Sequence, residues 1–303
     1  TIAHGRIKRI NYKTDQLKQK KFTIIKADDL IKEANRIDNT EEEFLASSEV
    51  SYYGQPIAII VAENEREAWT MAKMVQVEYE PLPVIATIDE EIENGKCHDG
   101  PKIQVGDDVE KIFKKFENEK GQFRVISGSV KMGGQYHIYL EPNASIASHT
   151  RDDQYILRPT TKNLDSAREG AAKNLGINQN QVYVDVKRLG GSFCAKSTRS
   201  SIVSTATAIA SQKLDCQVKM RLPRDVDTRI MSGDHVFVNN YKACFDVTTG
   251  KVVALKMDFY VDAGFWYQTT KGLALKALLH ADSAYKIPNL EINTHLCQTN
   301  KIS

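Results

Sequence analysis

The amino-acid sequence predicts a protein of mixed α/β (α+β) class with two domains. Its 303 residues are more than one domain usually holds. Short apolar segments alternate with amphipathic helical segments over residues 1–92, and residues 122–303 mix longer strands with helices. The polar residues 93–121 lie between these parts and are expected to be a connector. The alternative, a surface excursion within one domain, stays open.

The first part of the chain is expected to hold a βαβ unit. Strands are expected over residues 6–12, 22–26, 57–62 and 76–79. The third of these segments is wholly apolar, as is typical of a strand buried on both faces. The helix after it is expected to start at Asn64, because Glu67 gives the spacing of a capping box. Strand, helix and strand in this order favour a right-handed crossover. The charged residues 38–43 are expected to form an exposed loop.

The second part is expected to combine two helices with longer strands. Strands are expected over residues 122–131, 182–186, 236–246 and 252–261, the last two joined by a hairpin turn. The first helix is expected to start from Asn163 or Asp165. It should end at Gly176, because glycine favours the conformation that follows a helix. The second helix, over about 198–212, has many small side chains, so we expect it to be buried.

Composition argues against several classes of partner. The 41 basic and 39 acidic residues give a net charge of +2, without the basic excess of a nucleic-acid-binding protein. The longest apolar run, residues 57–62, is far shorter than the roughly 20 residues that cross a membrane. The opening residues show no secretory leader. The abrupt start and end are what we expect of a piece of a longer protein.

The cysteines are scattered and odd in number. They are Cys97, Cys194, Cys216, Cys244 and Cys297, without a C-x-x-C pair. This pattern argues against a disulfide framework and against a cysteine-ligated zinc or iron–sulfur site. Reduced thiols and a cytoplasmic location are therefore expected. The seven histidines also lack the spacing of a metal-binding motif.

Two glycine clusters are candidates for ligand contact. Gly190 and Gly191 stand between a strand and a helix, where backbone N–H groups can meet an anion. An ordinary tight turn explains this feature equally. Residues 190–197 are also one residue from the P-loop pattern, but Ala195 stands where that pattern needs glycine. In the second cluster, Gly134 precedes Gln135, whose amide can donate to a ligand oxygen or lie on a surface bend.

Four motifs, in order along the chain, resemble one family. Residues 51–57 read S-Y-Y-G-Q-P-I and residues 77–83 read V-E-Y-E-P-L-P, which together resemble the α/β hammerhead domain of xanthine dehydrogenases and aldehyde oxidases. Residues 133–142, 186–193 and 280–289 resemble signatures of the first molybdopterin-binding region of that family. The chain is identified by these motifs as a divergent member.

The resemblance implies a molybdenum hydroxylase that oxidises aldehydes or N-heterocycles. It implies a cytoplasmic homodimer with small-molecule substrates and with neither nucleic acid nor membrane as partner. The implied cofactor here is molybdenum-molybdopterin. FAD and two [2Fe–2S] clusters are expected on parts outside these 303 residues. A degenerate paralogue, which keeps the fold as an inactive scaffold or dimer partner, remains the alternative.

The resemblance also assigns roles to individual residues. Gln135, beside Gly134, falls on the glutamine that contacts a molybdenum oxo ligand, and Phe193 on the phenylalanine whose backbone lies against the metal. Gly191 and Cys194 belong to the same cofactor-facing turn. The substrate-binding positions are Ser197 and Lys276. No catalytic residue is expected in this chain, because the family's catalytic glutamate comes later, so this chain alone should show no turnover.

The turn departs from the family pattern G-G-G-F-G-G-K-E. Ser192, Cys194 and Ala195 replace three glycines. Cys194 and Ala195 are expected to add atoms where backbone should touch the cofactor, and overfilling typically costs about 1–3 kcal/mol. Ser197 replaces a glutamate. Lys276 replaces an arginine, and lysine lacks the planar fork of that side chain.

Overall fold

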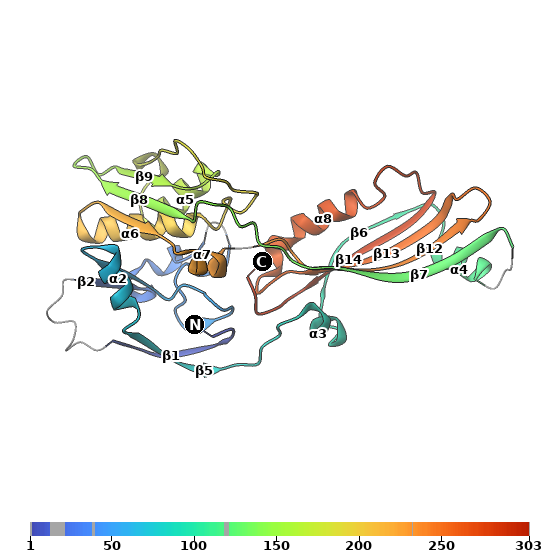
Figure 1. Cartoon of the computed structure of the whole chain (residues 1–303), viewed down its shortest axis with the longest axis horizontal. Coiled ribbons are helices and arrows are strands. Elements are labelled where there is room, and N and C mark those ends of the chain that lie inside the picture. Colours follow the sequence, from blue (N-terminus) through green and yellow to red (C-terminus); the bar gives the residue numbers. More distant parts are fainter. Residues whose placement is uncertain (1, 13–21, 38–39, 118–120, 232, 303) are drawn as a thin grey trace. The chain divides into compact units, whose positions relative to one another are not determined.

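The computed structural model describes residues 2–12, 22–37, 40–117, 121–231 and 233–302. It divides into two compact units, each made of two chain segments (Figure 1). Unit 1 comprises residues 1–84 and 136–233, and unit 2 comprises residues 85–135 and 234–301. Residues 38–39 of the predicted loop 38–43 and residues 118–120 of the predicted connector 93–121 lie outside the described residues.

The first segment of unit 1 forms two small antiparallel sheets. Their strands are β1 (Gly5–Tyr12), β3 (Glu49–Val50) and β5 (Val75–Pro81) in the order β3-β1-β5, and β2 (Phe22–Lys26) paired with β4 (Ala58–Ala62). Short 3-10 helices follow β2 at Ala27–Asp29 and Lys32–Ala34. Helix α2 (Glu65–Ala72) starts as predicted, with the Asn64 side chain accepting from the Glu67 N–H.

The predicted βαβ unit is wrong. Strands β4 and β5 flank α2 but belong to different sheets, because β4 pairs with β2 and β5 pairs with β1. Strand β4 is also not buried on both faces, since only Ile59 within it is buried. A two-stranded ribbon that packs with one face explains its apolar sequence without a central position in a sheet.

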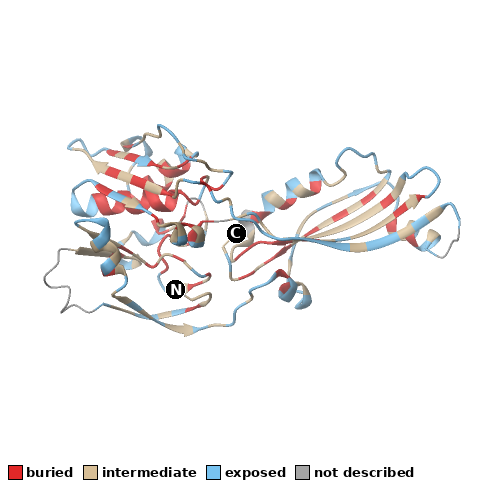
Figure 2. Cartoon of the chain, in the orientation of Figure 1, coloured by how far each residue is buried: buried red, intermediate tan, exposed pale blue. Residues whose placement is uncertain are grey.

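The second segment of unit 1 is a four-stranded sheet covered by helices. The strand order is β10-β9-β8-β11, with β8 (Ala144–His149), β9 (Tyr155–Pro159), β10 (Val182–Val184) and β11 (Val218–Arg221). The helices are α5 (Leu164–Leu175), α6 (Ser201–Leu214) and α7 (Arg224–Ile230), with a 3-10 turn at Gln179–Gln181. Asn163 caps α5 and Gly176 ends it at φ +69°, as predicted. Helix α6 is buried from Ser201 to Ser211, which confirms the prediction from its small side chains (Figure 2).

Both segments of unit 1 share one core and one buried ion pair. Ile25 and Ile59 of the first segment pack in the same apolar cluster as Ala206 of α6. Near this core, Arg199 donates to both carboxylate oxygens of Glu42, at 2.7 and 3.0 Å. The Tyr52 hydroxyl donates to Glu42 at 2.8 Å and accepts from Arg199 at 2.8 Å. Glu42 is only 7% exposed, so the prediction of an exposed loop is wrong at this position.

Unit 2 is a five-stranded sheet with helices on both faces. The strand order is β6-β14-β13-β12-β7, with β6 (His98–Val105), β7 (Phe123–Met132), β12 (Phe237–Asp246), β13 (Val252–Asp262) and β14 (Asn289–Cys297). Strands β13 and β14 run parallel, and the other neighbours are antiparallel. The helices are α3 (Ile88–Glu93), α4 (Val109–Phe116) and α8 (Lys271–Leu279), with a 3-10 turn at Tyr267–Thr270. Phe113 of α4 packs on Ala254, and Leu278 of α8 packs on the opposite face with Leu255.

The interpretation of residues 93–121 as a connector is wrong for the residues described there. They carry the edge strand β6 and helix α4, which are integral parts of unit 2. Their polarity has a structural reason. An edge strand exposes much of its length, and α4 buries only Val109 and Phe113 while its lysines face solvent. None of the described helices is long and apolar enough to cross a membrane.

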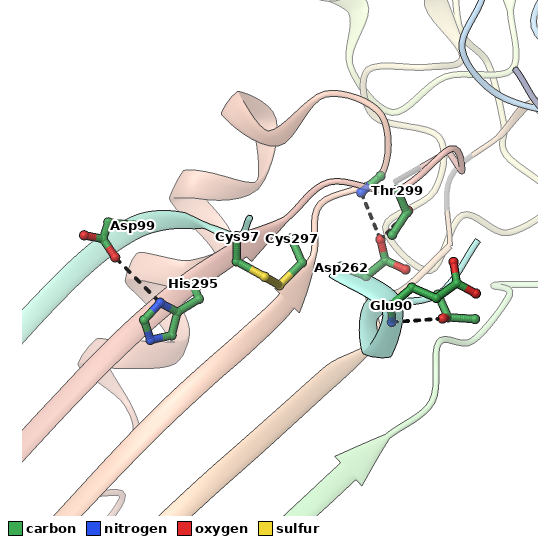
Figure 3. The surroundings of a disulfide bond; sticks show 9 residues. Glu90, Cys97, Asp99, Asp262, His295, Cys297 and Thr299 are labelled. Carbon is green, nitrogen blue, oxygen red and sulfur yellow. Dashed lines mark hydrogen bonds and ion pairs between the residues drawn. A yellow bond between two sulfur atoms is a disulfide. The ribbon is translucent and has the colours of Figure 1, made fainter. Parts of the chain in front are cut away.

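The expectation that all cysteines are reduced is wrong for one pair. Cys97 and Cys297, 200 residues apart in sequence, form a disulfide bond in unit 2 (Figure 3). The fold brings them together because each lies at the same end of the β6–β14 ladder, a pairing that cysteine spacing cannot reveal. Cys194 and Cys216 are exposed thiols, and Cys244 is a buried thiol.

We predict that Arg199→Ala lowers the free energy of unfolding of unit 1 by about 3–5 kcal/mol, because it leaves the Glu42 carboxylate buried without its cation. Chemical denaturation measures this loss. The matched control is Arg158→Ala, since Arg158 pairs with Asp185 at 3.3 Å but is half exposed. That control should cost less than about 1 kcal/mol. Equal losses in the two variants would contradict the assigned role of the buried pair.

Candidate functional site

The turn over residues 190–197 carries four of the predicted site residues. It follows β10 in unit 1 and precedes α6. Three of its residues have left-handed backbone conformations, with φ of +99° at Gly191, +46° at Phe193 and +77° at Cys194. Glycine adopts this region freely, whereas other residues pay about 1–2 kcal/mol. Glycine, which the resembled family pattern has at position 194, would adopt this conformation without strain, whereas Cys194 adopts it at a cost.

A buried ion pair holds this turn in place. The Lys196 ammonium group is fully buried and donates to Glu141 Oε2 at 2.8 Å. The same carboxylate oxygen accepts from the Gly190 N–H at 2.9 Å, and the Glu141 N–H donates to the Gly190 carbonyl at 3.2 Å. The two chain segments 139–143 and 190–197 are thus joined by three hydrogen bonds.

Electrostatics keep Glu141 ionised. Partial burial alone would raise the pKa of Glu141, but the hydrogen bonds from Lys196 and Gly190 and the positive charge of Lys196 outweigh it. The pKa of Glu141 therefore lies below its ordinary value. The Lys196 ammonium also lies 4.9 Å from the centre of the Tyr139 ring, a cation–π distance. No cysteine or histidine takes part in this network.

A second network fixes the segment that supplies Glu141. Asp227 of α7 accepts from the Tyr139 hydroxyl at 2.5 Å and from the Asn143 N–H at 2.8 Å. Arg224, also on α7, donates to the carbonyls of Tyr139 and Leu140 at 2.5 and 2.9 Å. Burial is the main reason that the pKa of Tyr139 is raised, so its hydroxyl remains a donor. Helix α7 therefore acts as a support for residues 139–143.

The outer side of this region is apolar and uncovered by the described residues. Phe193 is 71% exposed, Ile138 is 72% exposed, and Leu140 is 91% exposed. Ile138 also has a left-handed backbone conformation, with φ +41°. Exposed large apolar side chains on a tightly bonded backbone are typical of a surface that contacts a ligand or another part of a protein.

Cys194 and Ala195, which replace glycines of the resembled pattern, differ in exposure. Ala195 is buried, so its methyl group packs inside unit 1 and does not fill the outer side of the turn. Cys194 is exposed, and its Sγ lies 3.6 Å from Lys162 Nζ. The expected overfilling is therefore confined to Cys194. Ser197 is half-buried, and its carbonyl accepts from the Ser200 hydroxyl.

The structure excludes the P-loop alternative for residues 190–197. A P-loop lysine must reach a phosphate, but Lys196 is buried and bound to Glu141. The following helix starts only at Ser201, four residues beyond the last residue of the pattern. The resemblance to that motif is a coincidence of residue types.

The other predicted residues, Gly134, Gln135 and Lys276, belong to unit 2. The carbonyl of Gln135 accepts from the Asp234 N–H at 2.7 Å, and its side chain is exposed. A Cβ atom at Gly134 would lie 2.8 Å from the Asp234 carbonyl oxygen. This glycine is therefore required by the close approach of two backbone segments. Lys276 is exposed in the last turn of α8.

A separate cavity of about 1360 Å³ lies in unit 1. It is lined by β4 and α2 on one side and by α6 and β11 on the other, with Trp69, Ile202 and Met220 among its apolar walls. None of the predicted site residues lines it.

Within the part of the chain that the structure describes, no group of three or more His, Cys, Asp or Glu residues is placed to hold a metal ion.

The supporting charges are the residues that sequence reasoning missed. Lys196 and Glu141 both stand inside motifs that the sequence shows, but neither is among the site residues predicted from them. A signal was available, because each is a charged residue inside an otherwise apolar or glycine-rich segment, and such a residue needs a partner when buried. Asp227 carries no such signal in the sequence.

Comparison with known proteins identifies the class and then the family. Residues 88–303 match the molybdopterin cofactor-binding domain. Residues 1–83 match the a/b hammerhead domain of aldehyde oxidase and xanthine dehydrogenase. The chain therefore belongs to the aldehyde oxidase and xanthine dehydrogenase family, which confirms the resemblance of its four motifs.

Individual relatives and solved structures agree with this assignment. The chain is 37% identical over 262 residues to xanthine dehydrogenase/oxidase of Rattus norvegicus, and 35% identical over 260 residues to xanthine dehydrogenase of Dictyostelium discoideum. Each match covers 86% of this chain and 19% of the relative. The chain thus spans about a fifth of the length of these relatives. The aldehyde oxidoreductase of Desulfovibrio gigas covers 99% of this chain and 34% of its own, with a TM-score of 0.86 and 22% identity, which confirms the mixed α/β fold.

We predict that the stabilising effect of Glu141 is lost in acid. Because the pKa of Glu141 is lowered by folding, its stabilisation is present above the unfolded value of about 4.3 and disappears as the pH falls through the lower folded value. Glu141→Gln should therefore unfold at lower denaturant than the unmodified chain at pH 7, and the gap should narrow as the pH falls below about 4.3 and through the lower folded pKa. Denaturation at several pH values measures this. Glu63→Gln, at an exposed position, is the control, and a gap independent of pH would contradict the ion pair.

Proposed function

We propose that the chain forms part of a molybdenum hydroxylase and that the turn over residues 190–197 contacts its molybdopterin-bound molybdenum. One observation carries the proposal. In a chain of this family, the turn is held rigidly from inside by Lys196 while Phe193 and the neighbouring backbone remain open on the outside. A rigid turn with an open backbone is what close approach to a cofactor requires.

The residues of the turn fit such a group. At Gly191, a Cβ atom would lie 3.3 Å from Tyr139 Cβ and 3.4 Å from the Phe193 ring, and φ is +99°. Only glycine leaves this position open and unstrained. Gly191 and Phe193 would then present backbone to the group. The bound centre would supply a two-electron oxidation.

The substrate proposed is an aldehyde or a small N-heterocycle. Ser197 offers a hydroxyl group where a carboxylate would bind a cationic or N–H-bearing ring. Lys276 offers a mobile point charge and not the planar fork that grips a substrate through two bonds. Taken singly, each of these residues supports a substrate that needs few directional contacts. The relatives' names support the same range, from xanthine dehydrogenase to aldehyde oxidoreductase.

The wider arrangement is proposed on family grounds alone. Electrons would leave through two [2Fe–2S] clusters to FAD, all carried outside these 303 residues. The protein would act as a cytoplasmic homodimer on small molecules. The catalytic carboxylate would also lie outside this chain.

We predict that Gly191→Val reduces the molybdenum and pterin content of the purified full-length protein about tenfold or more, which corresponds to roughly 1.4 kcal/mol of binding. The added Cβ atom would lie unusually close to Tyr139 Cβ (3.3 Å) and to the Phe193 ring (3.4 Å), and valine is strained at φ +99°. Elemental analysis and pterin fluorescence measure the content. The matched control is Gly250→Val, because Gly250 has a similar φ of +73° but no neighbour within 4 Å of its Cβ position. Equal content in both variants and the unmodified protein would overturn the assignment of the turn.

We further predict that Cys194→Gly raises the cofactor content, because it relieves the left-handed strain at φ +77° and removes a side chain from the open face. Ala195→Gly should not raise it, since Ala195 is buried. The same two assays measure both variants. Complete absence of molybdenum and pterin from every form, under cofactor-replete expression, would favour the inactive paralogue.

A further inference from the structure

The two bonded cysteines stand opposite each other in a ladder that does not depend on the bond. Cys297 is the last residue of β14, and Cys97 immediately precedes β6. The antiparallel register pairs Leu296 with His98, so the next pair along the ladder is Cys297 with Cys97, whose Cα atoms are 4.3 Å apart. This is the close spacing of a non-hydrogen-bonded pair. Backbone hydrogen bonds of the ladder would therefore keep both sulfurs opposed after reduction.

Access to the two sulfurs is unequal. Cys297 is fully buried, in a cluster with Ile88 and Val238, whereas Cys97 is only half-buried at the edge of the same cluster. An incoming thiolate must approach the sulfur–sulfur bond in line, so solvent access favours attack at Cys97. The departing thiolate would then be that of Cys297, in apolar surroundings that disfavour a charge. The disulfide between Cys97 and Cys297 would therefore re-form unless a second thiol of the reagent completes the reduction.

We propose that Cys97 and Cys297 form a reversible dithiol–disulfide site that exchanges with dithiols and with peroxide. In reduction, a thiolate of a dithiol attacks Cys97 Sγ and forms a mixed disulfide with it, while the Cys97–Cys297 bond breaks and Cys297 Sγ takes the electron pair and a proton. The second thiol of the reagent then displaces Cys97, so two protein thiols and the reagent's disulfide result. In oxidation, hydrogen peroxide and the two thiols yield the disulfide and two molecules of water. Each direction transfers two electrons and two protons.

The bond is placed to control the segment that follows β14. Directly after Cys297, the Gln298 amide donates to the Phe265 carbonyl at 2.7 Å, and the Thr299 hydroxyl donates to Asp262 at 2.7 Å (Figure 3 labels Thr299 and Asp262). Asn300 exchanges hydrogen bonds with the backbone of Ile85, at 2.9 and 2.8 Å. The disulfide also ties residues 85–135 to residues 234–301, the two segments of unit 2. Its opening leaves this end of the edge strand β6 held by the ladder hydrogen bonds, by the stacking of His98 on Tyr267 and by the ion pair between Asp99 and His295.

Counting of alkylated cysteines tests the site. The folded protein is equilibrated in dithiothreitol buffers of graded ratio, quenched in acid, alkylated under denaturing conditions and analysed by mass spectrometry. Among the five cysteines of residues 1–303, the expected result is a reversible change between three and five alkylated, with a linked peptide that contains Cys97 and Cys297. Hydrogen peroxide should restore three. Cys216→Ser, which removes an exposed free thiol, should change between two and four at the same ratio.

Hydrogen exchange gives a second readout. Reduction should speed exchange of the amides around residues 96–99 and 297–300 severalfold and leave the centre of β12 unchanged. Cys97→Ala should exchange like the reduced protein in any buffer; because Cys97 is only half-buried, this variant keeps the packing of the fully buried Cys297. Three outcomes would each overturn the proposal. The first is five alkylated cysteines in every buffer, and the second is a count that rises from three to five only when the protein unfolds. The third is hydrogen exchange that does not change on reduction. None of these outcomes depends on molybdenum, so the result is separate from the proposed function.

Discussion

The ion pair between Lys196 and Glu141 is the constraint on which the candidate site depends. A fully buried ammonium group is costly without a partner, and Glu141 is that partner at 2.8 Å. The same carboxylate also accepts a hydrogen bond from the Gly190 N–H. The Glu141 side chain therefore positions both Gly190, at the start of the turn, and Lys196, near its end. Left-handed residues at 193 and 194 persist because these bonds over-determine the backbone. The strained backbone is thus held from the interior of unit 1, while the side chains of Phe193, Ile138 and Leu140 stay exposed.

A second buried pair connects this site to the rest of unit 1. Arg199 follows Lys196 by three residues and binds Glu42, which belongs to the first segment of the chain. Two cations in one short stretch are therefore paired with acids from two separate segments. This arrangement holds the turn although residues 192, 194 and 195 are not the glycines of the family pattern that it resembles. The anchors lie at Lys196 and Arg199, and neither is altered by those changes.

The sequence predicted local structure well where the cause is local. Asn64 and Asn163 cap their helices and Gly176 ends one, because these roles depend on a few adjacent backbone groups. The small side chains of α6 correctly indicated burial. The sheet that contains β4, the burial of Glu42 and the bond between Cys97 and Cys297 were not predictable, since each depends on a partner far away in sequence. The turn over residues 190–197 was predicted from its motif, whereas the ion pair of Lys196 and Glu141 that holds this turn was not.

The most direct measurement is the molybdenum and pterin content of the intact protein with Lys196 replaced by methionine, after expression with the cofactor available. Methionine fills much of the same volume without the charge. The account predicts that Lys196→Met loses most of both components, while Lys187→Met, at an exposed lysine beside the turn, keeps them. A Lys196→Met protein that retains molybdenum and pterin at the level of the Lys187→Met protein would contradict the central claim.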